Sequence, residues 1–527
     1  MNDEQLIAAL RAAIGVERVL DDASTRSYYA HDLFWYGNAP ACVVRPADAA
    51  QVQAIAKIAA QAGRPLVPRG GGMSYTGGYV ADDASAVLLD LAGMNRVLKI
   101  DEANRYVTVE AGCTWAQLHE ALAAKGLRTP YWGPLSGQRA SVGGTASQNS
   151  VFFGSVRHGS AAETVLAIDV VLADGQLLQT GGSGRKDGVP FVRWGGPDIT
   201  GLFIGDAGAF GIKVGVTLRL ITPAQAVGFG SFGFGDFATM LQAQAELVRA
   251  GLGAETFGID AYKARNSAQT GRKLGEASKT ALGVIKSGKS LLSGLKDVAG
   301  MAMAGTNALE NAAYSLHLTV EGDSEADTER QLKRVEAIVE KCRGWVLPPV
   351  VPKAMRGRPF PPLRSALGVD GQRWVPVHGI LPLGSAAACV AEVEAMITAR
   401  QTELEQMGVL YSPLTTNVPN GILFEPCYYW YDEVTQLHVD ATEVGEAPAE
   451  WKQRANRPDL RAYVMGLWQD TARILAKHGA VNFQIGRAYP YLDTVSAPYA
   501  ALIKSVKQAL DPQARVNPGA LGLPRSV

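Results

Sequence analysis

The chain has 527 residues, of which 47% are hydrophobic and 19% are charged, so we expect two or three folded domains rather than a disordered or fibrous protein. Lysine plus arginine equals aspartate plus glutamate at 50 each, which favours neither a nucleic acid nor an acidic partner. The five cysteines are scattered without a CxxC pair, a pattern typical of reduced thiols rather than of a disulfide framework or a zinc site.

The N-terminal stretch MNDEQLIAALRAAIG predicts a short amphipathic helix. It lacks the basic segment and the continuous apolar segment of a signal peptide. No run of about 18 apolar residues occurs in the chain, so we expect no membrane-spanning helix and a cytoplasmic protein.

Strand-like and helix-like patterns alternate over the first 220 residues. ACVVRP (41–46) predicts a strand, and DAAQVQAIAKIAAQAG (48–63) predicts a helix that Asp48 caps and Gly63 ends. PLVPRG (65–70) predicts the next strand, and the strands AVLLDL, RVLKID and YVTVEAG then precede the helix WAQLHEALAAKG. This order predicts an α+β fold and not a doubly wound nucleotide-binding sheet.

Glycine-rich stretches follow these strands. PRGGGMSYTGG (68–78) is a loop whose unhindered N–H groups suit phosphate oxygens. It is no P-loop, because no GK[ST] follows, and it does not open a helix as GxGxxG does. SVGGTASQNSVFFGSVRHG (141–159) is the second stretch, and LFIGDAGAFGIKVGVTLRL (202–220) adds a third glycine turn that leads into a strand.

The order of these pieces resembles the FAD-binding domain of the vanillyl-alcohol oxidase and p-cresol methylhydroxylase family over residues 38–222. The tail DPQARVNPGALG (511–522) is similar to the family's closing segment. The resemblance implies a two-lobed FAD-binding domain over 1–222, a substrate domain over 223–488, and a C-terminal segment, 489–527, that returns to the first domain. It also implies that FAD is held by Pro68, Arg69, Gly70, Gly71, Gly72, Met73, Ser74, Gly77, Pro134, Ser141, Val142, Gly143, Gly144, Asn149, Gly154, His158, Gly159, Ile212 and Asn517.

The methionine in the first glycine loop bears on how the flavin is held. Several relatives in the family have GGHS in this loop and bond the histidine covalently to the flavin. This chain has GGMS, and Met73 cannot attach in that way. We therefore predict non-covalent FAD, with attachment through His378 or His438 as the alternative.

The second domain shows a repeated strand-then-helix unit. NAAYSLHLTVEG (311–322) and WVPVHGILPLG (374–384) are each followed by a long helical pattern, which predicts a ferredoxin-like sheet with helices on one face. This pairing puts His317 and His378 on equivalent strands. Two unrelated units that look alike are the alternative.

A helical insertion is expected over 265–310. Within it, residues 273–305 predict an amphipathic helix with Lys279, Lys286, Lys289 and Lys296 beside an apolar face. A membrane surface could bind that face peripherally, on the inner side of the cytoplasmic membrane. Packing against another subunit is the alternative, and we expect a homodimer or a higher homo-oligomer.

The resemblance implies an FAD-dependent oxidoreductase that takes a hydride from an alcohol or 2-hydroxy acid carbon to flavin N5. A quinone, a cytochrome or oxygen would then receive the electrons. ILFEPCYYWYDE (422–433) resembles a stretch of bacterial D-lactate- and glycolate-dehydrogenase-like flavoproteins, and FQIGRAYPYLD (483–493) contains an arginine and tyrosines. We therefore predict Arg487, Tyr489 and His378 as catalytic residues.

Two alternatives stay open at this point. Arg487 with a tyrosine would also suit a phenolate, so oxidation of a para-substituted phenol or a lignin-derived aromatic alcohol is the second prediction. A flavin-fold protein that has lost its chemistry is the third, which the intact glycine loops disfavour. The histidines are isolated and form no HxxxGDGNxH-like signature, so we expect no metal site.

Overall fold

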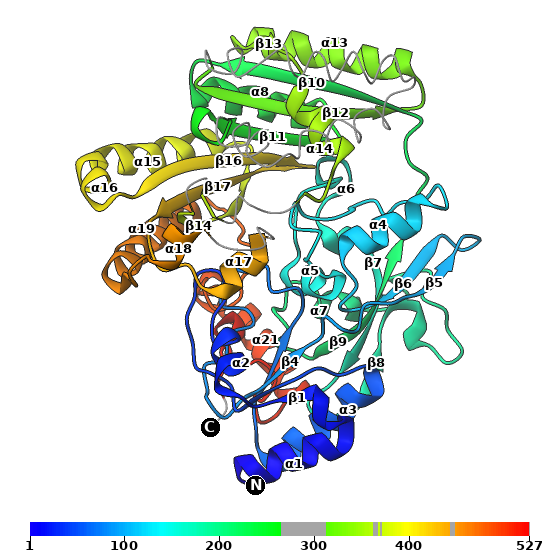
Figure 1. Ribbon diagram of the computed structural model, residues 1–527. Helices are drawn as coiled ribbons and strands as arrows, with labels where there is room; N and C mark the ends of the chain where they lie inside the picture. The colour runs from blue at the N-terminus through cyan, green and yellow to red at the C-terminus, as the bar shows by residue number, and fades with distance from the viewer. Residues whose placement is uncertain (265–311, 362–366, 369–370, 443–447, 526–527) are drawn as a thin grey trace. The chain divides into compact units, whose positions relative to one another are not determined.

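The computed structural model describes residues 1–264, 312–361, 367–368, 371–442 and 448–525. The chain divides into two compact units (Figure 1). The first unit contains Met1–Val151, Ser160–Thr222 and Phe483–Val527, and the second contains Phe152–Gly159 and Pro223–Asn482. The C-terminal residues therefore group with the N-terminal ones.

The first unit begins with a four-stranded sheet. Its order is β1 (Val19–Leu20), β2 (Cys42–Val44), β4 (Val87–Asp90) and β3 (Leu66–Arg69), with β2, β4 and β3 parallel. Helix α3 (Ala49–Ala62) connects β2 to β3. The predicted cap is confirmed, because the Asp48 side chain accepts the N–H of Gln51 and Gly63 ends the helix at a φ of 65°.

A five-stranded antiparallel sheet forms the other lobe. Its order is β5 (Val97–Asp101), β6 (Tyr106–Glu110), β9 (Ile212–Arg219), β7 (Val165–Val171) and β8 (Leu177–Gln179). One apolar core joins the lobes, since it contains Val52 of α3, Leu89 of β4 and Val171 of β7. The predicted two-lobed α+β domain is confirmed. Its other helices are α1 (Asp3–Ile14), α2 (Ala23–Tyr28), α4 (Trp115–Ala123), α5 (Val142–Gln148), α7 (Ile199–Leu202), α20 (Tyr491–Thr494) and α21 (Ala497–Leu510).

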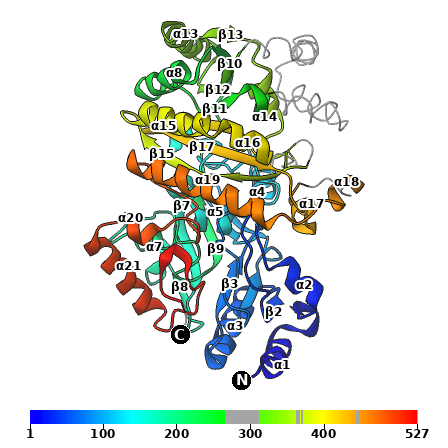
Figure 2. The same cartoon turned by 90° about the vertical axis from the view of Figure 1, so that its left-hand side faces the viewer.

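The second unit contains an eight-stranded sheet, and its first half has the predicted ferredoxin-like topology. The chain runs through β10 (Ala226–Phe234), α8 (Phe237–Arg249), β11 (Glu255–Asp260), β12 (Tyr314–Gly322), α13 (Glu325–Lys341) and β13 (Trp345–Leu347). The spatial order β13-β10-β12-β11 places the fourth strand beside the first and the third beside the second. Figure 2 shows α8 and α13 together beside this half of the sheet.

The second half repeats the topology. Strand β14 (Arg373–Pro376) precedes β15 (Gly379–Pro382), α15 (Ala386–Ala399), α16 (Gln401–Met407), β16 (Leu410–Val418), β17 (Gly421–Trp430) and α19 (Pro458–Lys477). Val481 then pairs with Ile380 of β15, so the order again runs fourth, first, third, second. Among the described residues, this unit also contains the short helices α6 (Ser155–His158), α14 (Val350–Gly357), α17 (Gln436–Thr442) and α18 (Ala449–Lys452).

The repeat corrects the pairing of His317 with His378. His317 lies on β12, the third strand of the first half, and its counterpart is β17. His378 lies between β14 and β15, at the first strand of the second half. The sequence pattern was misleading because a ferredoxin-like unit has a helix after its first strand and another after its third. A strand followed by a helix can therefore be either of these two pairs, and the sequence does not distinguish them.

In the part of the chain that the structure describes, no helix has the length and apolar character needed to cross a membrane. The lysine-rich segment 273–305 lies outside the described residues, so the predicted amphipathic helix stays a prediction.

Candidate functional site

The two glycine motifs of the first unit touch each other. A Cβ atom on Gly71 would lie 1.8 Å from the carbonyl oxygen of Arg139, and one on Gly70 would lie 2.3 Å from Oγ of Ser141. Only glycine lets the backbone after β3 come this close to the turn that precedes α5. Residues about 70 positions apart therefore form one continuous surface.

The loop presents a row of free N–H groups on that surface. Within the described residues, the N–H groups of Gly70, Gly71, Gly72 and Met73 have no hydrogen-bond acceptor. Gly72 has a φ of 70°, and alternation of such a residue with its neighbours turns successive N–H groups toward one side. These groups fit the phosphate oxygens of a dinucleotide, which would satisfy donors that the protein leaves without partners.

Asp32 fixes the far end of the loop, and sequence reasoning missed it. The side chain is fully buried. One carboxylate oxygen accepts the N–H groups of Phe34 and Trp35, and the other accepts the N–H of Gly77 at 2.7 Å. The only signal in the sequence is an aspartate in an aromatic stretch, HDLFWYG, which does not identify a partner 45 positions away.

The side chain of Arg69 packs against the loop at Gly72. Its guanidinium lies 4.4 Å from the ring centre of Tyr29 and 5.2 Å from that of Tyr79, in a buried position against Gly72. Cation–π contacts of this kind stabilise a cation away from water. Arg69 thus lies beside the loop that we expect to bind the pyrophosphate, but its positive charge faces the tyrosine rings. Its contact with the pyrophosphate stays a prediction.

The guanidinium of Arg487 is bonded to other parts of the first unit. Its Nη atoms donate to the carbonyl oxygen of Gly77 at 2.5 Å, to the side-chain oxygen of Asn517 at 2.7 Å and to the carbonyl oxygen of Pro518 at 2.7 Å. Its Nε lies 3.4 Å from the carboxylate of Asp82. The side chain therefore ties the C-terminal return to the glycine loop, and its catalytic role stays a prediction.

Asn517 completes the tie. Its side-chain nitrogen donates to the carbonyl oxygens of Gly78 and Ala207, at 2.8 and 2.6 Å. The residue is buried and adopts a φ of 43°, which asparagine tolerates better than most residues. Its side chain is thus fully engaged by protein, so the predicted contact with the cofactor would have to be made by its backbone.

The other residues predicted to hold FAD fall on both units. Asn149 ends α5 at a φ of 52° and accepts the N–H of Ala162, while the Ile212 side chain is buried in the core, which leaves only its backbone for a cofactor. Gly154, His158 and Gly159 belong to the second unit by their contacts. The remaining predicted residues lie in the first unit, and they are Pro68, Ser74, Pro134, Val142, Gly143 and Gly144.

The predicted catalytic residues are not all in one unit. Arg487 and Tyr489 lie in the first, where Tyr489 is buried, and His378 lies in the second and is fully buried. Burial lowers the pKa of His378 to about 3, so the imidazole is neutral near pH 7 and a weak proton acceptor. The alternative attachment residue His438 is also buried in the second unit.

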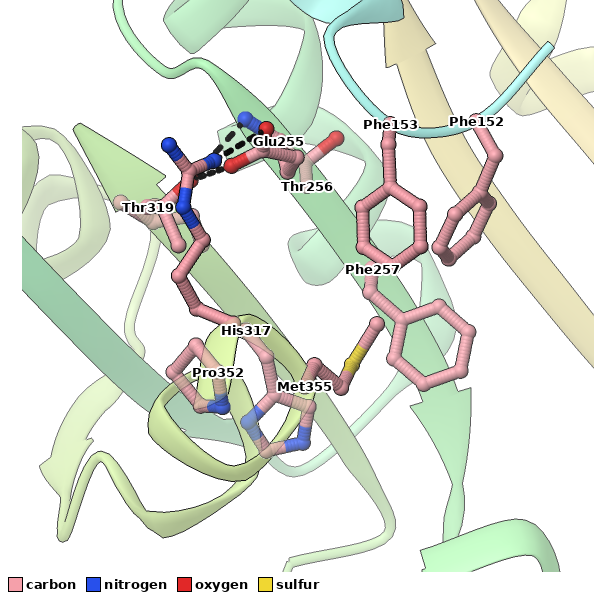
Figure 3. Close-up of a pocket in the computed structure, with 11 residues that line it drawn as sticks. Phe152, Phe153, Glu255, Thr256, Phe257, His317, Thr319, Pro352 and Met355 are labelled. Atoms are coloured by element: carbon pink, nitrogen blue, oxygen red, sulfur yellow. Dashed lines mark hydrogen bonds and ion pairs between the residues drawn. The ribbon is translucent and has the colours of Figure 1, made fainter. Parts of the chain in front are cut away.

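One face of the second unit's sheet carries a narrow aromatic pocket (Figure 3). Phe152, Phe153 and Phe257 line one side of it, and His317, the cross-strand neighbour of Phe257, lies near Pro352 and Met355 of α14. Both ring nitrogens of His317 face hydroxyls, Ser231 Oγ at 2.8 Å and Ser315 Oγ at 3.0 Å, and burial lowers its pKa to about 3.

The positive charge of Arg356, which lines this pocket, is balanced by two carboxylates. Arg356 of α14 bonds to Glu255 at 2.9 Å and to Glu321 at 2.5 Å. A guanidinium held by two carboxylates is a poor site for a further anion. The pocket therefore suits an apolar group and not a carboxylate.

A second set of polar side chains lies on β17 and its neighbours. Glu425 is partly buried, and its carboxylate lies 3.8 Å from Sγ of Cys427. Burial is the largest cause that raises the pKa of Glu425 to about 7, and the positive charge of Lys263 opposes it. Lys263 donates to the carbonyl oxygen of Ser412 at 2.6 Å and lies 5.5 Å from the ring centre of Tyr429. We call Glu425, Cys427, Lys263, Ser412 and Tyr429 the Glu425 cluster.

Across residues 1–264 and the later described ranges, no group of three or more His, Cys, Asp or Glu side chains is placed to hold a metal ion. The expected lack of a metal stays a prediction, because this observation concerns only the described residues.

Comparisons with known proteins identify the family of one part of the chain. Residues 40–181 match the family described as FAD binding domain. The chain is 32% identical over 208 residues to glycolate oxidase subunit GlcD of Bacillus subtilis (strain 168), which is 39% of this chain and 43% of that protein. It is 31% identical over 251 residues to a probable mitochondrial D-lactate dehydrogenase of Danio rerio, which is 47% of this chain and 49% of that protein. The chain thus spans about half the length of these curated relatives.

The likeness in fold extends beyond these residues. A crystal structure of p-cresol methylhydroxylase with substrate bound superposes with a TM-score of 0.71 at 17% identity, covering 99% of this chain and 97% of that one. The resemblance to the vanillyl-alcohol oxidase and p-cresol methylhydroxylase family is confirmed, by the family match for residues 40–181 and by the fold beyond them.

Proposed function

Since the chain carries an FAD-binding domain, we propose that it is an FAD-dependent oxidoreductase that removes a hydride from the CH–OH carbon of a 2-hydroxy acid. The observation that carries the proposal is the row of four free N–H groups at Gly70–Met73, closed by the second glycine motif. A flavin-fold protein that had lost its cofactor would have no need to keep these donors unpaired.

The first unit would hold the cofactor. The N–H groups of Gly70–Met73 would bind its phosphates, and Asp32, Arg69 and Arg487 would keep the loop in place. FAD, when bound, supplies the acceptor for the hydride. Met73 stands where covalent relatives have histidine, so we propose that binding is non-covalent.

The substrate class rests on the relatives. Their names describe a glycolate oxidase subunit and a D-lactate dehydrogenase, and both substrates are 2-hydroxy acids. The phenol alternative has less support, because Arg487, the residue expected to bind a phenolate, is occupied by Gly77, Asn517 and Asp82. The aromatic pocket of the second unit would suit a phenol ring, so the experiment below includes phenols.

Anaerobic flavin bleaching tests the proposal. Purified holoprotein would be mixed with D-lactate, glycolate, D-2-hydroxyglutarate, mandelate, vanillyl alcohol and p-cresol, and the flavin absorbance followed. We expect bleaching by at least one 2-hydroxy acid and slower or no bleaching by the phenols. Bleaching by p-cresol or vanillyl alcohol alone would favour the alternative, and a colourless protein that takes up no FAD would overturn both.

A further inference from the structure

We propose that the side chains of Gln148 and Trp35 bind an uncharged polar part of FAD, Gln148 through its amide oxygen and Trp35 through its indole N–H. These roles rest on the proposed function, because they concern the same FAD site. Two atoms of the first unit are buried and have no hydrogen-bond partner among the described residues, and they are Oε1 of Gln148 and Nε1 of Trp35.

An unpaired polar atom away from water is unfavourable in a folded protein. Folded proteins pair the large majority of their buried donors and acceptors, because an unpaired one has lost its water without gaining a partner. A buried acceptor and a buried donor that stay unpaired beside a cofactor loop therefore indicate a ligand that supplies both partners.

Asp32 fixes Trp35 beside the glycine loop. Its carboxylate accepts the N–H of Trp35 at 2.6 Å and the N–H of Gly77 at 2.7 Å, and its own N–H donates to the carbonyl oxygen of Trp35 at 2.9 Å. The indole ring also lies against the loop, since a Cβ atom on Gly77 would be 3.6 Å from Cγ of Trp35. The ring that bears the unpaired N–H thus packs on the loop at Gly77.

Gln148 reaches the next residue of the same loop. It is the last residue of α5, and its carbonyl oxygen accepts the N–H of Gln484 at 2.9 Å, so the C-terminal segment holds its backbone. Its side-chain nitrogen would lie 2.5 Å from a Cβ atom on Gly78, which places the amide directly beside the loop backbone. The unpaired donor and the unpaired acceptor therefore belong to side chains that contact consecutive loop residues.

The chemistry of the two atoms differs from that of the phosphate end of the loop. The four N–H groups at Gly70–Met73 are all donors, and they fit phosphate oxygens, which only accept. At Gly77 and Gly78 the unpaired atoms are one donor and one acceptor, and an ionised phosphate has no proton for the oxygen of Gln148. Hydroxyls, N–H groups and carbonyls of the flavin, ribityl and adenosine parts of FAD can satisfy such a mixed pair.

The test uses the full chain prepared without FAD and compares Gln148→Met and Trp35→Phe with the wild type. These substitutions remove the unpaired oxygen and the unpaired N–H but keep an apolar side chain in each place. Each variant should bind FAD about 3- to 10-fold more weakly in a fluorescence titration, because one hydrogen bond to the cofactor is lost. Gln61→Met and Trp194→Phe are the controls, since both residues are exposed in the first unit, and they should keep the wild-type affinity.

The stability of Gln148→Met separates ligand binding from a structural role. Methionine is close to glutamine in size, and the unpaired oxygen destabilises the protein without FAD. The melting temperature of this variant without FAD should therefore stay the same or rise by about 2–4 °C, while its affinity for FAD falls. A residue that only supports the loop would lower both quantities, so a melting temperature that falls together with the affinity would overturn the assignment.

Smaller probes identify the part of FAD that is bound. Inorganic pyrophosphate should bind the two variants and the wild type equally, because the N–H groups of Gly70–Met73 are unchanged. Weaker binding of ADP as well as FAD would assign the two side chains to the adenosine part, and weaker binding of FAD alone would assign them to the riboflavin part. Weaker binding of pyrophosphate would show that the loop itself has moved and would overturn the assignment.

The outcomes also distinguish these roles from the proposed function. Wild-type FAD affinity in either variant would overturn the role of that residue, and it would leave the function in place as long as a 2-hydroxy acid bleaches the flavin. A wild-type protein that takes up no FAD would overturn both.

Discussion

Arg487 donates to the side-chain oxygen of Asn517 at 2.7 Å, while Asn517 donates to the carbonyl oxygen of Gly78 at 2.8 Å. The C-terminal segment is thus bonded to the cofactor loop more than 400 positions earlier. Arg487 adds a direct bond to Gly77. The loop that would hold FAD is therefore held in place by Arg487 and Asn517 of the C-terminal segment.

Replacement of Arg487 should therefore weaken cofactor retention. Arg487→Ala leaves the carbonyl oxygens of Gly77 and Pro518 without their donor, and we expect a loss of about 2–4 kcal/mol of stability in the first unit, with a lower FAD content. Thermal unfolding and the flavin-to-protein absorbance ratio would measure this. Arg525→Ala is the control, because Arg525 also meets Asp82 but is 77% exposed. Full FAD content with loss of flavin reduction alone would instead support the catalytic role predicted from the sequence.

Gly71 should tolerate no side chain. In Gly71→Ala the new Cβ would overlap the carbonyl oxygen of Arg139, so the loop and the second glycine motif must separate. We expect loss of FAD binding by titration and a destabilisation of about 2 kcal/mol or more. Gly93→Ala is the control, since nothing lies within 4 Å of its added methyl group. Equal FAD affinity in both variants would contradict the close contact.

Met73 should leave the flavin free to dissociate. A thioether at this position cannot form the bond that histidine makes in covalent relatives, so acid precipitation should leave the yellow colour in the supernatant. Colour that stays with the pellet would instead indicate attachment elsewhere, and peptide mapping would then distinguish His378 from His438.

Acid should destabilise the second unit through its buried histidines. The folded pKa of His317 is depressed to about 3, below the ordinary value of 6.5, so between those pH values the unfolded chain binds a proton that the folded chain does not. The stability is present above pH 6.5 and is lost as the pH falls, by about 3 kcal/mol for this residue at pH 4.

A substitution isolates that effect. His317→Asn should unfold at a lower pH than the wild type in a fluorescence titration, because asparagine has no proton to gain. His119→Asn, at a partly exposed position stacked on Trp132, should keep the wild-type acid sensitivity. Identical acid midpoints for His317→Asn and the wild type would show that His317 is protonated in the folded state.

Local patterns sufficed for the elements and for the cofactor loop. The helix over 48–63 was predicted with both of its caps, because Asp48 and Gly63 act on backbone groups within four positions of themselves. Strands β3, β4 and β6 lay where apolar runs placed them, and the glycine loop followed from consecutive residues without Cβ atoms. The two-lobed domain and the FAD family follow from the order of such local signals.

The roles of single side chains depended on tertiary structure. Nothing near Arg487 in the sequence indicates that Gly77, Asn517 and Pro518 use its donors, and nothing near Asp32 points to Gly77. His317 and His378 were paired wrongly because the repeat has two strand-then-helix units in each half. Glu425 appeared only as one acid in an aromatic strand, since its pKa is set by burial and by Lys263, 162 positions earlier. Local chemistry fixes where the backbone turns, whereas proton affinity and hydrogen-bond availability are set by neighbours that folding brings together.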